Sequence, residues 1–114
     1  MLVLETVGRK TGKARRTPLL YMEHHGRYIV VASNGGADWE PGWWLNLRSG
    51  QPATVRVGGP QRIPVAASEV VGPEREALWR LLNEQTFSYE KYQAKVHRQL
   101  AVVALDPSTA NTPA

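Results

Sequence analysis

Residues 2–22 set the architecture of this chain, and they read Leu2-Val3-Leu4-Glu5-Thr6-Val7, Gly8-Arg9-Lys10-Thr11-Gly12-Lys13-Ala14-Arg15-Arg16, Thr17-Pro18-Leu19-Leu20-Tyr21-Met22. Apolar and β-branched residues dominate the first and last parts of this stretch, which is typical of strands. We therefore expect strands over 2–7 and 17–23. The middle part contains Gly8 and Gly12 and is expected to form the turn between the two strands.

This turn concentrates positive charge. Five of the eight residues from Arg9 to Arg16 are cationic, and no acid lies between Glu5 and Glu23. Glycine amides can approach a phosphate closely, and arginine side chains add charge-assisted hydrogen bonds. The pattern predicts an anion cradle for a phosphorylated cofactor, with a solvated charged hairpin as the alternative. The glycine spacing is one residue short of a Walker loop, and no Ser or Thr follows Lys13.

The composition is that of a soluble globular domain: 114 residues, 42% hydrophobic and 21% charged. The net charge of +4 comes from residues 1–72, because the remaining residues hold equal numbers of basic and acidic side chains. There is no cysteine, which excludes disulfides, thiol nucleophiles and cysteine-based metal sites. His24 and His25 are adjacent and would face opposite sides of a strand, so we predict no metal site.

The remaining pattern predicts further strands over 28–32, 53–57, 62–71 and 100–105, and helices over 41–48, from 73 onward and over about 89–96. Pro64 indicates that the 62–71 strand is an edge strand or is bulged. Residues 106–114 are predicted to form a disordered tail. Strands joined by short turns favour antiparallel pairing, and we expect a small, partly open barrel of about six strands with helices outside.

Two further segments could line a ligand site. Ser33-Asn34-Gly35-Gly36 follows the most hydrophobic strand, and its glycines would let backbone amides face a planar or anionic ligand; an ordinary loop is the alternative. Trp39, Trp43 and Trp44 form the other segment. At least two of them are expected in the core, and one could form a wall for a flat ligand.

Tyr89 and Tyr92 lie one helical turn apart and so share a face. They could flank a substrate, and a phenol could donate a proton. Core or edge aromatic residues are the alternative interpretation.

Five motifs, taken in chain order, carry a resemblance to a known family: Gly8-Arg9-Lys10-Thr11-Gly12, Arg16-Thr17-Pro18-Leu19, Ala32-Ser33-Asn34-Gly35-Gly36, Trp43-Trp44-Leu45-Asn46-Leu47 and Ser88-Tyr89-x-x-Tyr92-Gln93. Together they resemble the deazaflavin (F420)-dependent nitroreductase and F420H2-dependent quinone reductase family. The likeness runs from about residue 2 to residue 105. It implies an α+β, mainly β fold: a split β-barrel of about six mostly antiparallel strands with two or three short outer helices. Residues 1–105 would form a single deazaflavin-binding domain.

The resemblance implies an oxidoreductase that transfers a hydride from reduced coenzyme F420 to an electron-poor acceptor such as a quinone or a nitroaromatic. FMN is the weaker cofactor candidate. Arg9, Lys10 and Arg16 would contact the phosphate and polyglutamate tail, with Thr11 and Gly12 shaping the turn. Ser33 and the two following glycines would lie along the ring. The implied cofactor-binding set is Arg9, Lys10, Thr11, Gly12, Arg16, Pro18, Ser33, Asn34, Gly35, Gly36 and Trp43.

The same resemblance implies an acceptor site bordered by Leu20, Trp43, Thr86, Tyr89 and Tyr92. Ser33 or Tyr89 would relay a proton to the acceptor oxygen. Some family members carry tyrosine where this chain has Leu20 and Thr86, which implies a different acceptor. Family members often carry lysine where Asn34 stands.

Three classes of function remain distinguishable. A reductase is favoured over a non-catalytic deazaflavin- or flavin-binding or storage module. Nucleic-acid binding ranks lowest, because the charge is compact and the aromatic residues form no stacking pattern for bases. We expect a small-molecule electron acceptor and no nucleic-acid partner. The fold also allows a homodimer. We expect a cytoplasmic location, with peripheral membrane contact if the acceptor is a lipid quinone.

Overall fold

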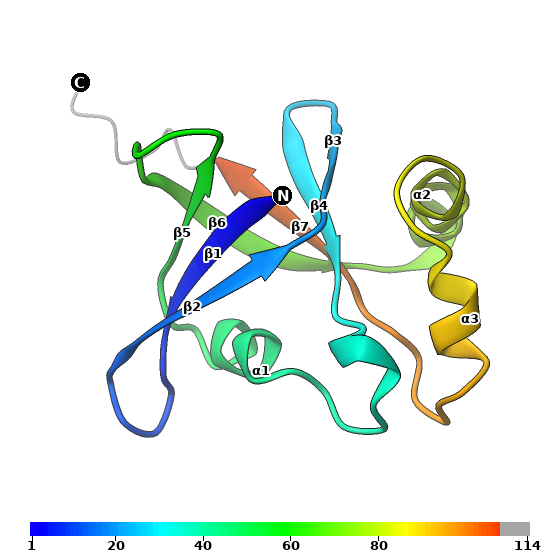
Figure 1. The fold of residues 1–114 in the computed structure, drawn as a ribbon, viewed down its shortest axis with the longest axis horizontal. Helices are drawn as coiled ribbons and strands as arrows, with labels where there is room; N and C mark the ends of the chain where they lie inside the picture. The colour runs from blue at the N-terminus through cyan, green and yellow to red at the C-terminus, as the bar shows by residue number, and fades with distance from the viewer. Residues whose placement is uncertain (108–114) are drawn as a thin grey trace.

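The computed structural model describes residues 1–107. Their seven strands form one antiparallel sheet in the order β2-β1-β5-β6-β7-β4-β3 (Figure 1). The strands are β1 (Leu2–Val7), β2 (Ala14–Leu19), β3 (Met22–His24), β4 (Arg27–Val31), β5 (Ala53–Val57), β6 (Ile63–Val70) and β7 (Val102–Pro107).

The two edge strands, β2 and β3, are joined by just Leu20 and Tyr21. In a flat sheet, seven strands spaced about 4.8 Å apart would hold the edges roughly 29 Å apart. The three Cα steps from Leu19 to Met22 span at most about 11 Å. The sheet therefore has to curl until its edges approach each other, which produces a barrel split between β2 and β3.

Four helical segments complete the described part of the chain: η1 (Asn34–Gly36), a single 3-10 turn, and α1 (Gly42–Arg48), α2 (Gly72–Gln85) and α3 (Tyr89–Gln93). Pro41 and Pro73 stand at the starts of α1 and α2, where a missing N–H costs no helical hydrogen bond. Figure 1 shows α1 beneath the crossing of β1 and β2, and α2 with α3 on the far side of β4.

The sheet separates two hydrophobic clusters, and β4 and β7 contribute to both. Val30, Val103 and Leu105 face the barrel interior, where they pack with β1, β5 and α1. Their neighbours on the opposite face of the sheet, which include Ile29 and Val102, pack against α2 and α3. Because β4 and β7 are covered on both faces, they read as continuous apolar runs rather than alternating ones.

The predicted strand over 17–23 is wrong as a single element. It divides into the end of β2 and the start of β3, so the sheet has seven strands instead of about six. Curling the sheet needs a corner at Leu20-Tyr21, and nothing in the local sequence marks that corner. β2 also starts earlier than expected, at Ala14, because pairing with β1 continues to Val7.

Pro64 does not place β6 at an edge, because β6 lies between β5 and β7. Pro64 pairs with Thr54 of β5, whereas pairing with β7 begins at Val65, so Pro64 has a paired neighbour on one side only within residues 1–107. A proline is tolerated on such a one-sided stretch. The predicted tail is shorter than expected, because Asp106 and Pro107 complete β7; the rest of it, 108–114, lies outside the described residues.

Candidate functional site

The basic turn is a six-residue loop, 8–13, that closes the hairpin of β1 and β2. The Gly8 N–H donates to the Lys13 carbonyl oxygen at 2.8 Å, and the Gly12 N–H donates to the Gly8 carbonyl oxygen at 2.9 Å. Gly12 has a φ of +70°, which glycine adopts without steric cost. The predicted turn and its glycines are therefore confirmed.

A buried asparagine fixes this loop to the body of the protein. Asn46 of α1 is 4% exposed, and its Oδ1 accepts from the Arg9 backbone N–H at 3.1 Å and from Arg9 Nη1 at 3.0 Å. Its Nδ2 donates to Thr6 Oγ1 at 3.3 Å. One amide side chain thus ties α1 to β1 and holds the first cation of the loop.

The loop, the start of α1 and Asn34 enclose a cleft of about 690 Å³. The predicted residues that line it are Arg9, Lys10, Thr11, Arg16, Asn34 and Trp43. Lys10 and Arg15 have no ion-pair partner among residues 1–107, so their charges are available to a ligand. The chemistry of this donor set fits a polyanion.

Strand register separates the two arginines of β2. Directly paired residues of an antiparallel sheet share a face. Arg15 pairs with Thr6, which is buried on the inner face, whereas Arg16 pairs with Glu5. Arg16 Nε donates to Glu5 Oε2 at 3.0 Å, and this bond holds the pKa of the Glu5 carboxyl below its ordinary value. Both arginines line the cleft, but Arg15, which the motif analysis left out, lies on the inner face with Thr6, whereas Arg16 is held by Glu5.

A second cavity of about 330 Å³ adjoins the first and shares four lining residues with it: Thr17, Asn34, Pro41 and Trp43. Its lining is largely aromatic and aliphatic, with Tyr89, Tyr92 and Phe87 on one side. The predicted residues that line it are Pro18, Leu20, Ser33, Asn34, Gly35, Trp43, Tyr89 and Tyr92. Trp43, which is 7% exposed, separates a basic half from an aromatic half.

Three predicted residues line neither of these two cavities: Gly12, Gly36 and Thr86. Thr86 caps the C-terminus of α2, and its neighbour Phe87 takes the place at the cavity. The Phe87 ring packs within 5.3 Å of Tyr89 and 5.2 Å of Tyr92, centroid to centroid. Gly36 lies behind the cavity wall, where a Cβ would stand 3.1 Å from Tyr92 Cδ1.

The backbone of the loop over 33–36 adopts the left-handed conformations that its glycines allow. Ser33 is in the right-handed helical region, and Asn34, Gly35 and Gly36 follow with φ of +48°, +62° and +85°. A right-handed residue followed by a left-handed one turns successive N–H groups toward one point, which is a common anion-binding geometry. Gly36 N–H is occupied by the Ser33 carbonyl oxygen, whereas the amides of residues 33–35 have no acceptor within the described chain.

Comparison with known proteins agrees with this geometry. The family model of the F420H2-dependent quinone reductases matches residues 1–107. The chain belongs to the F420H2-dependent quinone reductase family. The resemblance inferred from the five motifs is thereby confirmed, and so is the split-barrel fold.

Relatives of this family share most of the chain. An F420H2-dependent quinone reductase of Mycobacterium tuberculosis strain H37Rv is 37% identical over 107 residues, which cover 91% of this chain and 71% of the relative. A solved F420H2-dependent reductase superposes with a TM-score of 0.79 at 35% identity, and covers 92% of each chain. A structure described as a domain-swapped dimer gives a TM-score of 0.80 at 35% identity, with 92% of this chain and 78% of that one covered.

Three further features of this family member complete the description. Burial raises the pKa of the Tyr89 phenol, and the neighbouring Tyr92 adds to the effect, so Tyr89 keeps its proton to higher pH than an exposed tyrosine does. Within residues 1–107, no group of three or more His, Cys, Asp or Glu side chains is arranged to hold a metal ion. No helix in the same range is long and apolar enough to cross a bilayer.

We predict that Gly36→Ala destabilises the protein more than Gly35→Ala. Both positions have positive φ, which costs about 1–2 kcal/mol for a residue with a Cβ. At Gly36 the new methyl group must also displace the Tyr92 ring, whereas nothing lies within 4 Å of a Cβ at Gly35. Urea unfolding of both variants measures the difference. It should disappear when Tyr92 is replaced by alanine in both, and equal effects of the two substitutions with Tyr92 present would contradict the contact.

Proposed function

We propose that this protein is an F420H2-dependent quinone reductase whose two adjoining cavities hold the coenzyme and its acceptor side by side. The observation that carries the proposal is the shared wall: Thr17, Asn34, Pro41 and Trp43 border both the basic cleft and the aromatic cavity. A ligand with an anionic tail and an aromatic ring would place one part in each. Reduced F420, when bound, supplies the hydride that reduces the acceptor.

The basic half would hold the phosphate and polyglutamate tail. Arg9 is held at the cleft by Asn46, and Lys10 and Arg15 add charges with no competing acid nearby. Arginine forks suit phosphate and carboxylate oxygens because they donate two parallel hydrogen bonds. Arg16 already has Glu5 as a partner, so Arg15 is the better candidate for direct contact.

The shared wall would hold the ring system. The amides of Ser33, Asn34 and Gly35 would donate to carbonyl oxygens at the ring edge, which would hold the ring in place for hydride transfer. Trp43 would pack against the ring. Pro18 lies on the same side of the aromatic cavity and would limit where the ring ends.

The acceptor would enter between Leu20, Phe87 and the two tyrosines. The apolar lining favours a quinone over a charged substrate. Tyr89 retains its proton and could donate it to the acceptor oxygen, and Ser33 is the second candidate for that role. Thr86 drops out of the proposal in favour of Phe87, because it does not line the cavity.

One experiment distinguishes the reductase from a non-catalytic module that binds or stores a deazaflavin or flavin. Oxidised F420 and FMN are titrated against the protein and followed by fluorescence, and reduced F420 is then added with menadione. Preferential F420 binding with oxidation of the reduced coenzyme supports the reductase. Binding without turnover supports storage, and absence of binding overturns both.

The oligomeric state and the cellular location of the protein are also proposed. The domain-swapped structure similar to this chain makes a homodimer worth testing by light scattering. A cytoplasmic location with peripheral membrane contact is proposed from the chemistry of a lipid quinone acceptor.

We predict that the double substitution Arg9→Ala and Lys10→Ala weakens F420 binding by about 2–4 kcal/mol, because charge-assisted bonds to the tail are lost. The loop is exposed, so the fold should persist. Fluorescence titration measures the affinity, and circular dichroism checks the fold.

The strands supply matched controls for this prediction. Arg15→Ala should weaken F420 binding more than Arg16→Ala. Arg15 lies on the inner face of the sheet beside Thr6, whereas Arg16 forms an ion pair with Glu5. Arg62→Ala, whose side chain lies 3.8 Å from Glu5 and outside both cavities, should leave affinity unchanged. Unchanged F420 affinity in the double variant would contradict the proposal that the basic cleft binds the tail of the coenzyme.

We predict that Tyr89→Phe slows acceptor reduction while F420 affinity stays near that of the parent protein. Because the pKa of Tyr89 is raised in the folded state, the neutral phenol stabilises the fold below the ordinary pKa of about 10. This contribution is lost as pH rises through the higher folded pKa. Urea unfolding above pH 10 should therefore show a steeper loss of stability for the parent than for Tyr89→Phe.

An unchanged turnover number in Tyr89→Phe would mean that Ser33 or water, and not Tyr89, donates the proton to the acceptor oxygen. Parallel stability curves above pH 10 would contradict the buried phenol.

A further inference from the structure

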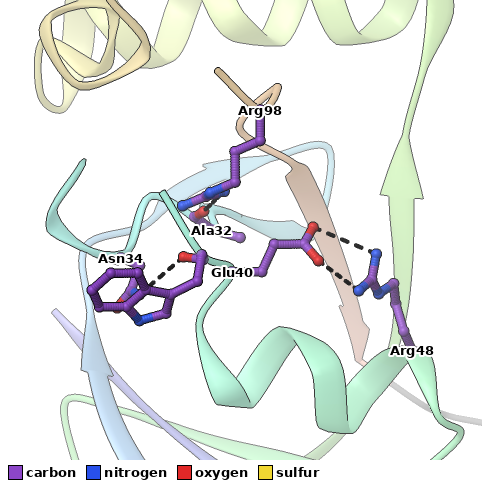
Figure 2. A network of polar contacts seen from close by, with 6 residues as sticks. Ala32, Asn34, Glu40, Arg48 and Arg98 are labelled. Atoms are coloured by element: carbon purple, nitrogen blue, oxygen red, sulfur yellow. Dashed lines mark hydrogen bonds and ion pairs between the residues drawn. The ribbon is translucent and has the colours of Figure 1, made fainter. Parts of the chain in front are cut away.

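Arg98 makes more hydrogen bonds than any other side chain described between residues 1 and 107. It lies between α3 and β7 and donates to three carbonyl oxygens that are more than 60 residues away in sequence. Nη1 donates to Ala32 at 3.0 Å, Nη2 to Ser33 at 3.1 Å and to Ala37 at 3.0 Å, and Nε to Ala37 at 3.2 Å. Figure 2 shows Arg98 reaching the segment around Ala32 from the side away from Glu40 and Arg48.

These bonds fix two peptide planes at the start of the loop over 33–36, namely the peptide groups 32–33 and 33–34. The peptide groups of this segment are trans, so the carbonyl oxygen of one residue and the N–H of the next point in opposite directions. With the oxygens of Ala32 and Ser33 held by Arg98, the amides of Ser33 and Asn34 are turned away from the guanidinium. These two amides are among those without an internal acceptor, and their residues line the aromatic cavity.

Arg98 is itself anchored to α3, the helix that contributes Tyr89 and Tyr92 to that cavity. Gln93 of α3 donates through Nε2 to the Arg98 carbonyl oxygen at 2.7 Å, and its Oε1 accepts from Leu100 N–H at 2.8 Å. The same short helix carries Tyr89 and Tyr92. Gln93 and Arg98 thus connect the helix of the two tyrosines to the loop of the free amides.

The charge of Arg98 has no acidic partner among the described residues. All four hydrogen bonds of its side chain go to neutral carbonyl groups, which polarises the peptides and makes their N–H groups stronger donors. A guanidinium in this place gives positive potential to the loop without touching the cavity ligand. None of the five motifs that identify the family includes Arg98.

We propose that Arg98 is a positioning residue that orients and polarises the Ser33 and Asn34 amides, so that they donate to the carbonyl oxygens of the bound deazaflavin ring and hold it in position for hydride transfer. This inference rests on the proposed function of the two cavities. A structural role alone would lower stability. A positioning role also lowers the turnover number and coenzyme affinity in protein that is fully folded.

The test uses Arg98→Ala, Arg98→Lys and the control Arg80→Ala, which removes an exposed arginine of α2 that lines neither cavity. Melting temperature, F420 affinity by fluorescence, and kcat and KM for menadione are measured for each at a temperature where all are folded. We expect Arg98→Ala to lose ~10-fold or more in both kcat and F420 affinity, because misplaced donors forfeit the preorganisation. The KM for menadione should change little, and Arg80→Ala should match the parent.

Arg98→Lys keeps the charge but cannot bond three carbonyl groups in a fixed fork. We expect it to fold and still to show several-fold lower kcat, so it decides the question even if Arg98→Ala does not fold. Added methylguanidinium should partly restore Arg98→Ala, and should not restore the Arg9 and Lys10 double variant.

Parent-like kcat and affinity in Arg98→Lys, without rescue in a folded Arg98→Ala, would overturn the inference while the proposed function stands. Failure of the parent protein to bind F420 would instead overturn the proposed function. The backbone amide chemical shifts of Ser33 and Asn34, measured by NMR without coenzyme, provide a readout independent of activity. Changed shifts at these two amides in Arg98→Lys are expected, and shifts identical to those of the parent would contradict the orientation argument.

Discussion

The two-residue connection between β2 and β3 is the constraint on which the rest of this structure depends. Because Leu20 and Tyr21 alone join the two edges of a seven-stranded sheet, the sheet has to curl. Curling brings the basic hairpin loop, the start of α1 and the loop over 33–36 to one side of the barrel. None of these segments is close to both others in sequence, and the shared wall of the two cavities exists only because of this closure.

The site combines charged side chains with oriented backbone groups. Charge comes from exposed side chains at the end of the β1–β2 hairpin, and the first of them, Arg9, is held by one buried amide, Asn46. Orientation comes from backbone groups, and those are restrained by one unpaired guanidinium, Arg98. In both places a single side chain makes several hydrogen bonds across a long sequence separation, and these bonds fix the geometry of the loop.

Local features of this fold could be read from the sequence, whereas features that depend on strand register could not. The hairpin turn, the strand β1, the start of α1 at Pro41 and the left-handed glycines near Gly35 follow from residue conformational preferences. The corner at Leu20 carries no local signal, because it arises from barrel closure. Which of Arg15 and Arg16 faces inward depends on the pairing of β2 with Glu5 and Thr6, which a run of five cations does not reveal.

The same distinction explains which site residues the motifs missed. Asn46 stood inside a motif, but its bond to Arg9 spans 37 residues. Arg98 is an isolated basic residue in a segment without a periodic pattern, and its role becomes visible only when β7 lies beside β4. A crystal structure with oxidised F420 would test the assignment of the basic cleft. The account predicts phosphate and carboxylate oxygens within hydrogen-bond distance of Arg9, Lys10 and Arg15, and a tail bound elsewhere, with these three cations in open solvent, would contradict it.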